Sequence, residues 1–263
     1  MGISKQEVKR LKEERLGEVG YNKYNTKMKI VEYNSYNDIV VEFQDEHRAR
    51  VHTGYGCFKK CGVGNPYDKT VLGVGYLGEG KYKEKINGKN TKVYSYWRHM
   101  LRRCYDPYVL NENISYIDCI VCKEWHNFQI FAQWFEENYY EIEGERMHLD
   151  KDILIKGNKI YSPDTCIIVP QRINSLFIKK QSDRGNCLIG VRWHKRDCVF
   201  EVRCNDIDCK QQYLGYFKDE YEAFMSYKQY KEKVIKQVAD RYKNTIPKKL
   251  YDALYRYEVE IND

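Results

Sequence analysis

The apolar residues change their spacing several times along the chain, and this change constrains the fold more than any other feature of the sequence. At Met28 and Ile30, and again at Ile39, Val41 and Phe43, they recur at every second position, whereas from Tyr96 to Cys104 they recur every three to four residues. Alternation at every second residue predicts strands, and the longer spacing predicts amphipathic helices. The sequence therefore predicts an α+β chain built from several parts.

The first part is a helix followed by a β-rich module. Residues 4–16 begin with a capping box and continue with apolar residues among charges, which predicts a short helix. The alternating segment and many turn residues then predict a small β-rich module over residues 17–67. Residues 1–70 are therefore expected to form an N-terminal helix and β-rich module.

Residues 71–95 are expected to form a β-arm or linker. They are rich in glycine and lysine, and they contain Asn87-Gly88. This dipeptide favours a two-residue hairpin turn. We therefore predict a hairpin with strands at 82–86 and 91–94.

Residues 96–180 are expected to form a third part. Its first helix begins at Tyr96, and a second helix over residues 123–138 carries aromatic side chains at helical spacing, which are expected to lie in a core. Residues 147–178 then predict a strand, a turn, a second strand and a short helix. A boundary follows at residues 182–185.

Residues 186–245 predict three strands and one long helix, and residues 246–263 predict a polar tail with a short helix at 250–257. The expected strands and helix cover residues 189–193, 199–204, 211–217 and 219–242. Strands followed by one helix predict a sheet packed on that helix.

Composition excludes some classes of protein. The mean hydropathy is −0.76 and 32% of residues are charged, yet 14% are aromatic and 25 are tyrosines. Disordered chains are poor in aromatics, so this chain is expected to fold. No apolar run is long enough for a membrane span and the first residues have no apolar signal region, so we expect a cytoplasmic protein. The net charge of +7 is compatible with DNA, RNA or an acidic protein surface.

The C-terminal part carries a set of motifs in a fixed order. They are Gly190-Val191-Arg192-Trp193, Glu201-Val202-Arg203, Tyr213-Leu214-Gly215-Tyr216-Phe217, Glu222-Ala223 and Tyr227. Over about 55 residues this order and spacing resemble the AP2/ERF family of DNA-binding domains. The resemblance implies a three-stranded sheet that lies in the major groove.

By position, the resemblance assigns DNA contacts to Arg192, Trp193 and Arg203, with Lys195 and Arg196 in the first turn. General principles agree, since a β-ribbon fits the major groove, Arg can read guanine and Lys can contact phosphate. An ordinary hairpin with solvated charges remains the alternative.

The middle part carries a second set of motifs. They are Tyr96-Trp97-Arg98-His99-Met100, Arg103-Cys104-Tyr105, Val121-Cys122-Lys123-Glu124-Trp125, Leu149-Asp150-Lys151-Asp152, Gly157-Asn158 and Tyr161-Ser162-Pro163-Asp164-Thr165-Cys166. They resemble a phage-associated group related to HNH endonucleases, often joined to an AP2-like domain. The resemblance implies a ββα-metal core over residues 96–180.

An active site of this kind needs a general base and ligands for a divalent cation such as Mg²⁺. The positions expected to hold the His base and the central Asn carry Lys151 and Thr165. Lysine is cationic at neutral pH and is a poor base beside a metal. A shifted catalytic site of His148, Asp150 and Asn174 remains an alternative, because His148 and Asp150 would share a strand face.

Four cysteines offer a second metal site. Cys119 and Cys122 have zinc-knuckle spacing, and Cys104 and Cys166 lie in the same part of the sequence. In a reducing compartment the ten cysteines are more often buried thiols or metal ligands than disulfides. We favour buried thiols over a structural zinc ion.

The leading hypothesis is a phage-type DNA-binding protein, derived from an HNH homing-endonuclease-like scaffold and impaired in catalysis. It would act on double-stranded DNA in the cytoplasm of a host bacterial cell, and binding would need no cofactor. Residues 186–245 are expected to carry most of the nonspecific affinity. The oligomeric state is left open.

Two alternatives belong to other classes. One is a metal-dependent DNA endonuclease. The other is a phage inhibitor that binds a host defence protein through aromatic anchors, for which the candidates are Tyr55, Phe58, Tyr76 and Tyr82.

Overall fold

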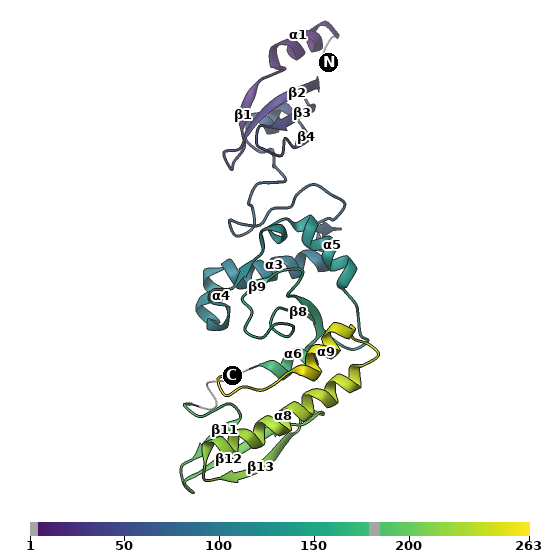
Figure 1. Ribbon diagram of the computed structural model, residues 1–263. Helices are drawn as coiled ribbons and strands as arrows, with labels where there is room; N and C mark the ends of the chain where they lie inside the picture. Colours follow the sequence, from purple (N-terminus) through teal and green to yellow (C-terminus); the bar gives the residue numbers. More distant parts are fainter. Residues whose placement is uncertain (1–4, 179–184) are drawn as a thin grey trace. The chain divides into compact units, whose positions relative to one another are not determined.

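The computed structural model describes residues 5–178 and 185–263. Ser4 in the expected first helix and residues 182–184 of the expected boundary lie outside the described residues. The chain divides into two compact units, Met1–Glu136 and Glu137–Asp263 (Figure 1). The prediction of a mixed α+β chain is confirmed.

The first unit begins with a four-stranded antiparallel sheet in the order β1-β2-β3-β4. Its elements are α1 (Lys5–Arg15), β1 (Val19–Tyr21), β2 (Lys27–Ser35), β3 (Asp38–Phe43), β4 (Arg50–Thr53) and α2 (Tyr55–Lys59). Met28 and Ile30 of β2 and Ile39, Val41 and Phe43 of β3 are buried in the core at the alternate positions predicted, and Val40 is buried as well. Phe58 of α2 is only 3% exposed in this core, so its role as an interface anchor was wrongly predicted.

The predicted hairpin turn at Asn87-Gly88 is confirmed, with β5 (Lys85–Ile86) paired to β6 (Lys89–Asn90). Both turn residues have positive φ, 50° and 75°, which suits Asn and Gly. The strand expected at 91–94 is wrong, because α3 (Lys92–Tyr105) starts there. The Thr91 hydroxyl accepts a hydrogen bond from the Tyr94 N–H and caps this helix.

The rest of the first unit is mainly helical. It contains α4 (Pro107–Glu112), η1 (Ile114–Tyr116), β7 (Ile120–Val121), η2 (Lys123–His126) and all but the last two residues of α5 (Phe128–Asn138). Trp97, Trp125 and Phe128 are fully buried, and the Trp97 indole donates a hydrogen bond to the Trp125 carbonyl at 2.7 Å. The prediction that the aromatic stripe forms core is confirmed.

The second unit begins with β8 (Met147–Asp150), which pairs antiparallel with β10 (Ile167–Pro170). The short β9 (Ile160–Tyr161) precedes β10, and α6 (Gln171–Asn174) and η3 (Ser175–Phe177) follow it. The chain therefore has the expected order of strand, turn, strand and short helix.

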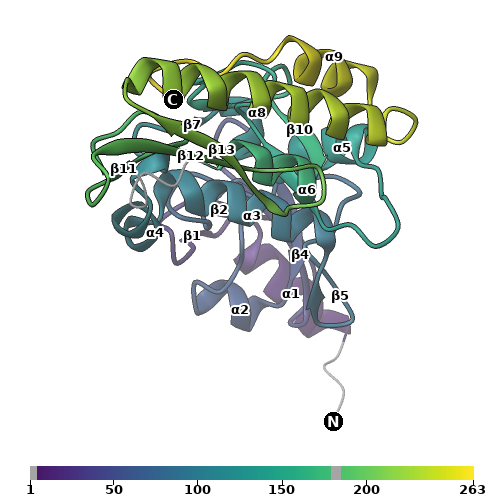
Figure 2. The ribbon, with the colours of Figure 1, turned by 90° about the horizontal axis from the view of Figure 1, so that it is seen from below.

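Three antiparallel strands and a long helix complete the second unit. They are β11 (Val191–His194), β12 (Val199–Asn205), β13 (Gln211–Phe217) and α8 (Glu220–Tyr242). In both ribbon views α8 lies along one face of this sheet (Figures 1 and 2). The predicted strands and helix agree with these bounds to within two residues.

The helix α8 belongs to two cores. Near its start it buries Phe224 and Tyr227 against the sheet. Two to three turns later it buries Val234 and Val238 in a second cluster with residues of β10, α6 and α9 (Lys248–Arg256). Leu250 and Leu254 of α9 are fully buried in that cluster, so much of the expected polar tail is packed.

The structure also bears on two expectations from composition, the lack of a membrane-spanning segment and the state of the cysteines. Within residues 5–178 and 185–263 no helix is both long and apolar enough to cross a membrane. All ten cysteines lie in these ranges and are free thiols.

Candidate nucleic-acid interface

The sheet of the second unit has one face against α8 and one face uncovered by that helix. Val191 pairs with Val202, and both side chains are buried against α8. Because side chains alternate along a strand, Arg192 and Glu201 lie on the opposite face, where they are also paired. We call this opposite face of β11–β13 the outer face.

Arg192 is the arginine of the outer face that is available to a ligand. It is exposed, and within the described part of the chain it has no hydrogen-bond or ion-pair partner. Arg203 is also exposed but is already engaged: its Nε and Nη2 donate to the Glu201 carboxylate at 2.9 and 2.6 Å, and its Nη1 donates to Gln211 at 3.1 Å. The two predicted arginines therefore lie on one face in different electrostatic states.

Glu201 lies between these arginines in the sheet and is 5% exposed. One carboxylate oxygen, Oε1, accepts both hydrogen bonds from Arg203, which neutralises the guanidinium and holds it in place, since charge-assisted hydrogen bonds are stronger than neutral ones. The sequence indicated a basic strand but not this pairing.

Trp193 lies on the other side of the sheet from Arg192. Alternation places it on the same side as Val191, and its ring packs against Phe200 with 4.8 Å between centroids. It remains 39% exposed at the edge of the sheet. The structure thus does not bring Trp193 together with Arg192 and Arg203.

Two tyrosines on the outer face were not assigned a role from the sequence. Tyr216 pairs with Glu201 and Tyr213 pairs with Arg203, because a bulge between Val202 and Arg203 shifts the register. Tyr213 and Tyr216 are 54% and 49% exposed, and their ring centroids are 5.2 Å apart. Simple alternation would have placed these tyrosines on opposite faces of the sheet. The bulge places them on the same face, so their proximity could not be predicted from the spacing in the sequence.

The turn between β11 and β12 carries Lys195 and Arg196, both exposed. Arg196 donates to the Asp197 carboxylate from Nε at 2.8 Å. This hydrogen bond holds the pKa of Asp197 below its usual range. Lys195 is therefore the more available cation of the turn.

The turn after β8 is organised by Lys151. Its ammonium donates to both carboxylate oxygens of Asp152, at 2.7 and 2.8 Å, and to the Asn158 carbonyl at 2.8 Å. The Asn158 side chain returns a hydrogen bond to the Lys151 carbonyl at 2.9 Å. Lys151 is only 5% exposed, so the residue at the position of the expected base has a structural role: its ammonium holds the two ends of this turn together.

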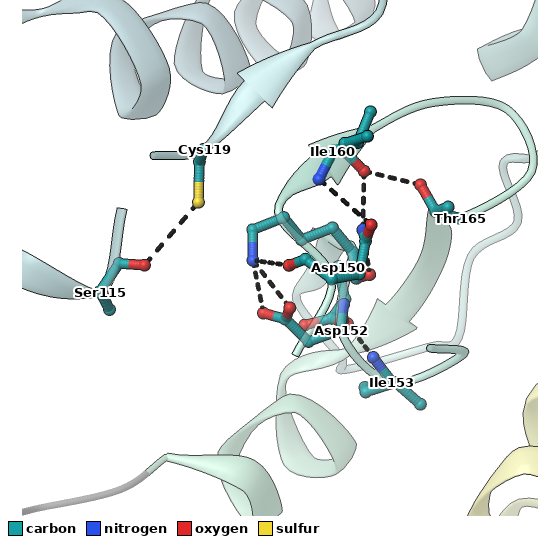
Figure 3. Close-up of polar contacts among 9 residues, drawn as sticks. Ser115, Cys119, Asp150, Asp152, Ile153, Ile160 and Thr165 are labelled. Atoms are coloured by element: carbon teal, nitrogen blue, oxygen red, sulfur yellow. Dashed lines mark hydrogen bonds and ion pairs between the residues drawn. The ribbon is translucent and has the colours of Figure 1, made fainter. Parts of the chain in front are cut away.

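The residues of the shifted catalytic site lie on two elements. His148 and Asp150 are on β8, two residues apart, and Asn174 ends α6, which packs against β8. One Asp150 carboxylate oxygen accepts the backbone N–H groups of Asp152 and Ile153, each at 2.8 Å (Figure 3). Burial raises the pKa of Asp150 despite these bonds.

Thr165, at the expected Asn position, also has a local structural role. Its hydroxyl donates to the Ile160 carbonyl at 2.7 Å and lies 2.9 Å from the Ser162 hydroxyl.

These groups do not fit a divalent cation well. One oxygen of Asp150 is saturated by backbone donors, and the Asp152 carboxylate is bound by the Lys151 ammonium. Across the described ranges there is no group of three or more His, Cys, Asp or Glu side chains arranged to hold a metal ion. A fixed ammonium beside the carboxylates further disfavours a second cation.

The four predicted cysteine ligands are distributed over both units. Cys104 and Cys119 are buried in the first unit, where the Cys119 thiol lies 3.8 Å from the Ser115 carbonyl (Figure 3). Burial raises the pKa of Cys122 to about 11, so this side chain is a thiol at neutral pH. Cys166 is buried in the second unit. Zinc binding by these residues stays the less favoured of the two alternatives.

Comparison with known proteins gives no match: no protein family, no curated protein and no solved structure is significantly similar to the chain.

Proposed function

We propose that the chain binds double-stranded DNA through the outer face of β11–β13. The observation that supports this most is the exposed Arg192, which has no acidic partner in the described residues and lies beside Arg203 and two exposed tyrosines. An unpaired arginine fork can read guanine or bind phosphate, and tyrosines can pack on sugars or bases. Lys195 in the neighbouring turn would add a phosphate contact.

The wider proposal is a phage-type protein on an HNH-like scaffold with an AP2-like sheet, acting in a bacterial cytoplasm. It is supported by the order β8, β10, α6 and by the packing of β11–β13 on α8. Lys151 argues against a working nuclease, because a buried, fully bonded ammonium cannot accept a proton from water.

Arg192→Ala should weaken duplex binding about 5- to 150-fold, as expected for the loss of one base or phosphate contact worth about 1–3 kcal/mol. Arg203→Ala should have a smaller effect, because Glu201 already neutralises Arg203. The measurement is a titration of labelled duplex by anisotropy at several salt concentrations. Each lost phosphate contact should reduce the salt slope by about 1.

The matched control is Lys236→Ala, which removes one positive charge from an exposed position on α8, away from the outer face. It should leave the affinity within about twofold. Equal losses for Arg192→Ala and Lys236→Ala would show a general charge effect and reject this interface.

A further inference from the structure

A cavity of about 720 Å³ lies beside the three-stranded sheet of the second unit. It lies where β11 begins: Val191, the first residue of β11, pairs with Val202, so the edge of β12 at Arg203–Asn205 is not covered by β11. The first turns of α6 and η3 and one side of α8 complete the walls. This volume lies within the range of about 300–1,000 Å³ typical of sites for small molecules.

The charged groups that line this cavity are strongly unbalanced. Four are cationic, from four different elements: Arg172 (α6), Arg192 (β11), Arg203 (β12) and Lys231 (α8). The lining contains one acidic side chain, Glu201, and it is already bonded to Arg203. The other three, Arg172, Arg192 and Lys231, form no ion pair with an acidic side chain among the described residues.

Arg172 and Lys231, the two cationic groups outside the sheet, form no ion pair within the described residues. Arg172 donates through Nη2 to the backbone carbonyls of Asp206 and Ile207, at 3.2 and 2.9 Å, which fixes the guanidinium while its charge is retained. Lys231 has neither a hydrogen bond nor an ion pair within the described ranges, although most of its surroundings are protein. Burial lowers the pKa of Lys231, and the nearby Arg172 lowers it further. Gathering such groups without a counter-charge is unfavourable unless an anion compensates them.

We propose that this cavity is a binding site for a phosphate-bearing ligand of nucleotide size. Phosphate presents several acceptor oxygens and up to two negative charges, which suits arginine forks and a lysine ammonium that converge from different elements. The remaining lining includes Leu176, Ile189 and Tyr227, which offer apolar contact to a base or sugar. This site goes beyond the duplex interface, since Arg172 and Lys231 are not on the outer face of the sheet.

The test uses the full chain and three probes: deoxyadenosine monophosphate, inorganic phosphate and deoxyadenosine, titrated by calorimetry and by ligand-dependent shifts in Tm. The nucleotide should bind more tightly than phosphate, and the unphosphorylated nucleoside should bind least. Lys231→Met and Arg172→Met should each weaken nucleotide binding about tenfold or more, as expected for one charge-assisted hydrogen bond. The control Lys236→Met keeps the same helix and charge change but lies outside the cavity.

Stability in the absence of ligand separates a binding role from a structural one. A lowered pKa means that the folded state binds the lysine proton less tightly than the unfolded state, so the charged form destabilises the fold at neutral pH. Lys231→Met should therefore raise the ligand-free Tm, or leave it unchanged, while it removes the shift caused by the nucleotide. A lower Tm together with unchanged nucleotide affinity would contradict the proposal.

The phosphate could come from a free nucleotide or from a DNA strand, and competition separates these sources. If DNA supplies the phosphate, duplex DNA should displace the nucleotide, and Lys231→Met should weaken the binding of both the nucleotide and the duplex. If a free nucleotide supplies it, both ligands should bind together, and Lys231→Met should affect the nucleotide alone. Absence of binding by both the nucleotide and phosphate, or equal binding by Lys231→Met and Lys236→Met, would overturn the inference. The calorimetric and Tm titrations need no DNA, so a failure of duplex binding leaves them interpretable.

Discussion

Gly190→Ala is expected to lower the free energy of unfolding of the second unit by about 2–5 kcal/mol. Gly190 has a φ of +78°, a conformation that an alanine adopts only with strain. A Cβ at this position would also overlap the ring of Tyr227, which packs against the start of β11. The ring is buried between the sheet and α8, so it has little room to move. Backbone strain and overpacking therefore add.

Gly157→Ala is the matched control for this substitution. Gly157 has nearly the same φ, +75°, but a Cβ there would meet nothing within 4 Å. It should cost only the backbone strain, about 1–2 kcal/mol. Denaturant unfolding measures both variants, and hydrogen exchange should show loss of protection in β11–β13 for Gly190→Ala. Equal destabilisation by Gly190→Ala and Gly157→Ala would show that contact between the new Cβ and Tyr227 does not contribute to the loss of stability.

Lys151→Met should destabilise the second unit by about 2–3 kcal/mol, since the substitution removes a buried ammonium that makes several charge-assisted hydrogen bonds. Asp152 keeps 49% of its side chain exposed and can be hydrated, which limits the loss. Lys236→Met, an exposed lysine on α8, should change the stability by less than about 0.5 kcal/mol.

The hydrogen bonds of the Lys151 ammonium also determine the expected effect of Lys151→His on stability and on nuclease activity. This substitution supplies the residue type of a general base, but it removes the ammonium that holds Asp152 and the Asn158 carbonyl. We therefore expect a less stable protein that still does not nick plasmid DNA in Mg²⁺ or Mn²⁺. Metal-dependent nicking by Lys151→His, or by the unaltered chain, would favour the endonuclease hypothesis instead.

Long periodic segments of this chain could be predicted from sequence, whereas short elements could not. The strands β12 and β13 and the helix α8 repeat their pattern over enough residues to be recognised. By contrast, β4 has only one aliphatic residue, Val51, and is held by pairing with β3. Thr91 could belong to a hairpin strand or a helix cap, and only the hydrogen bond to its hydroxyl distinguishes them.

The candidate site was predictable as a segment but not as a surface. Sequence placed Arg192, Trp193 and Arg203 on neighbouring strands, yet faces depend on register, and the bulge at Val202/Arg203 changes which side chains meet. The pairing of Glu201 with Arg203 and the burial of Lys151 also depend on tertiary packing. The cavity residue Lys231 gave no sequence signal, since its spacing matched the apolar face of a helix.

The sharing of α8 between two cores has a consequence for how the second unit opens and closes. In a fragment of residues 186–245, the buried side chains of Val234, Ile235 and Val238 would lose their packing partners, because those partners lie in β10, α6 and α9. Unfolding of the sheet should therefore be thermodynamically coupled to unfolding of the β8–β10 region, as one cooperative transition. A ligand held by the outer face would then slow amide exchange in α9, although it touches none of its residues. Any exchange of this sheet between proteins would have to carry the whole of Glu137–Asp263 with it.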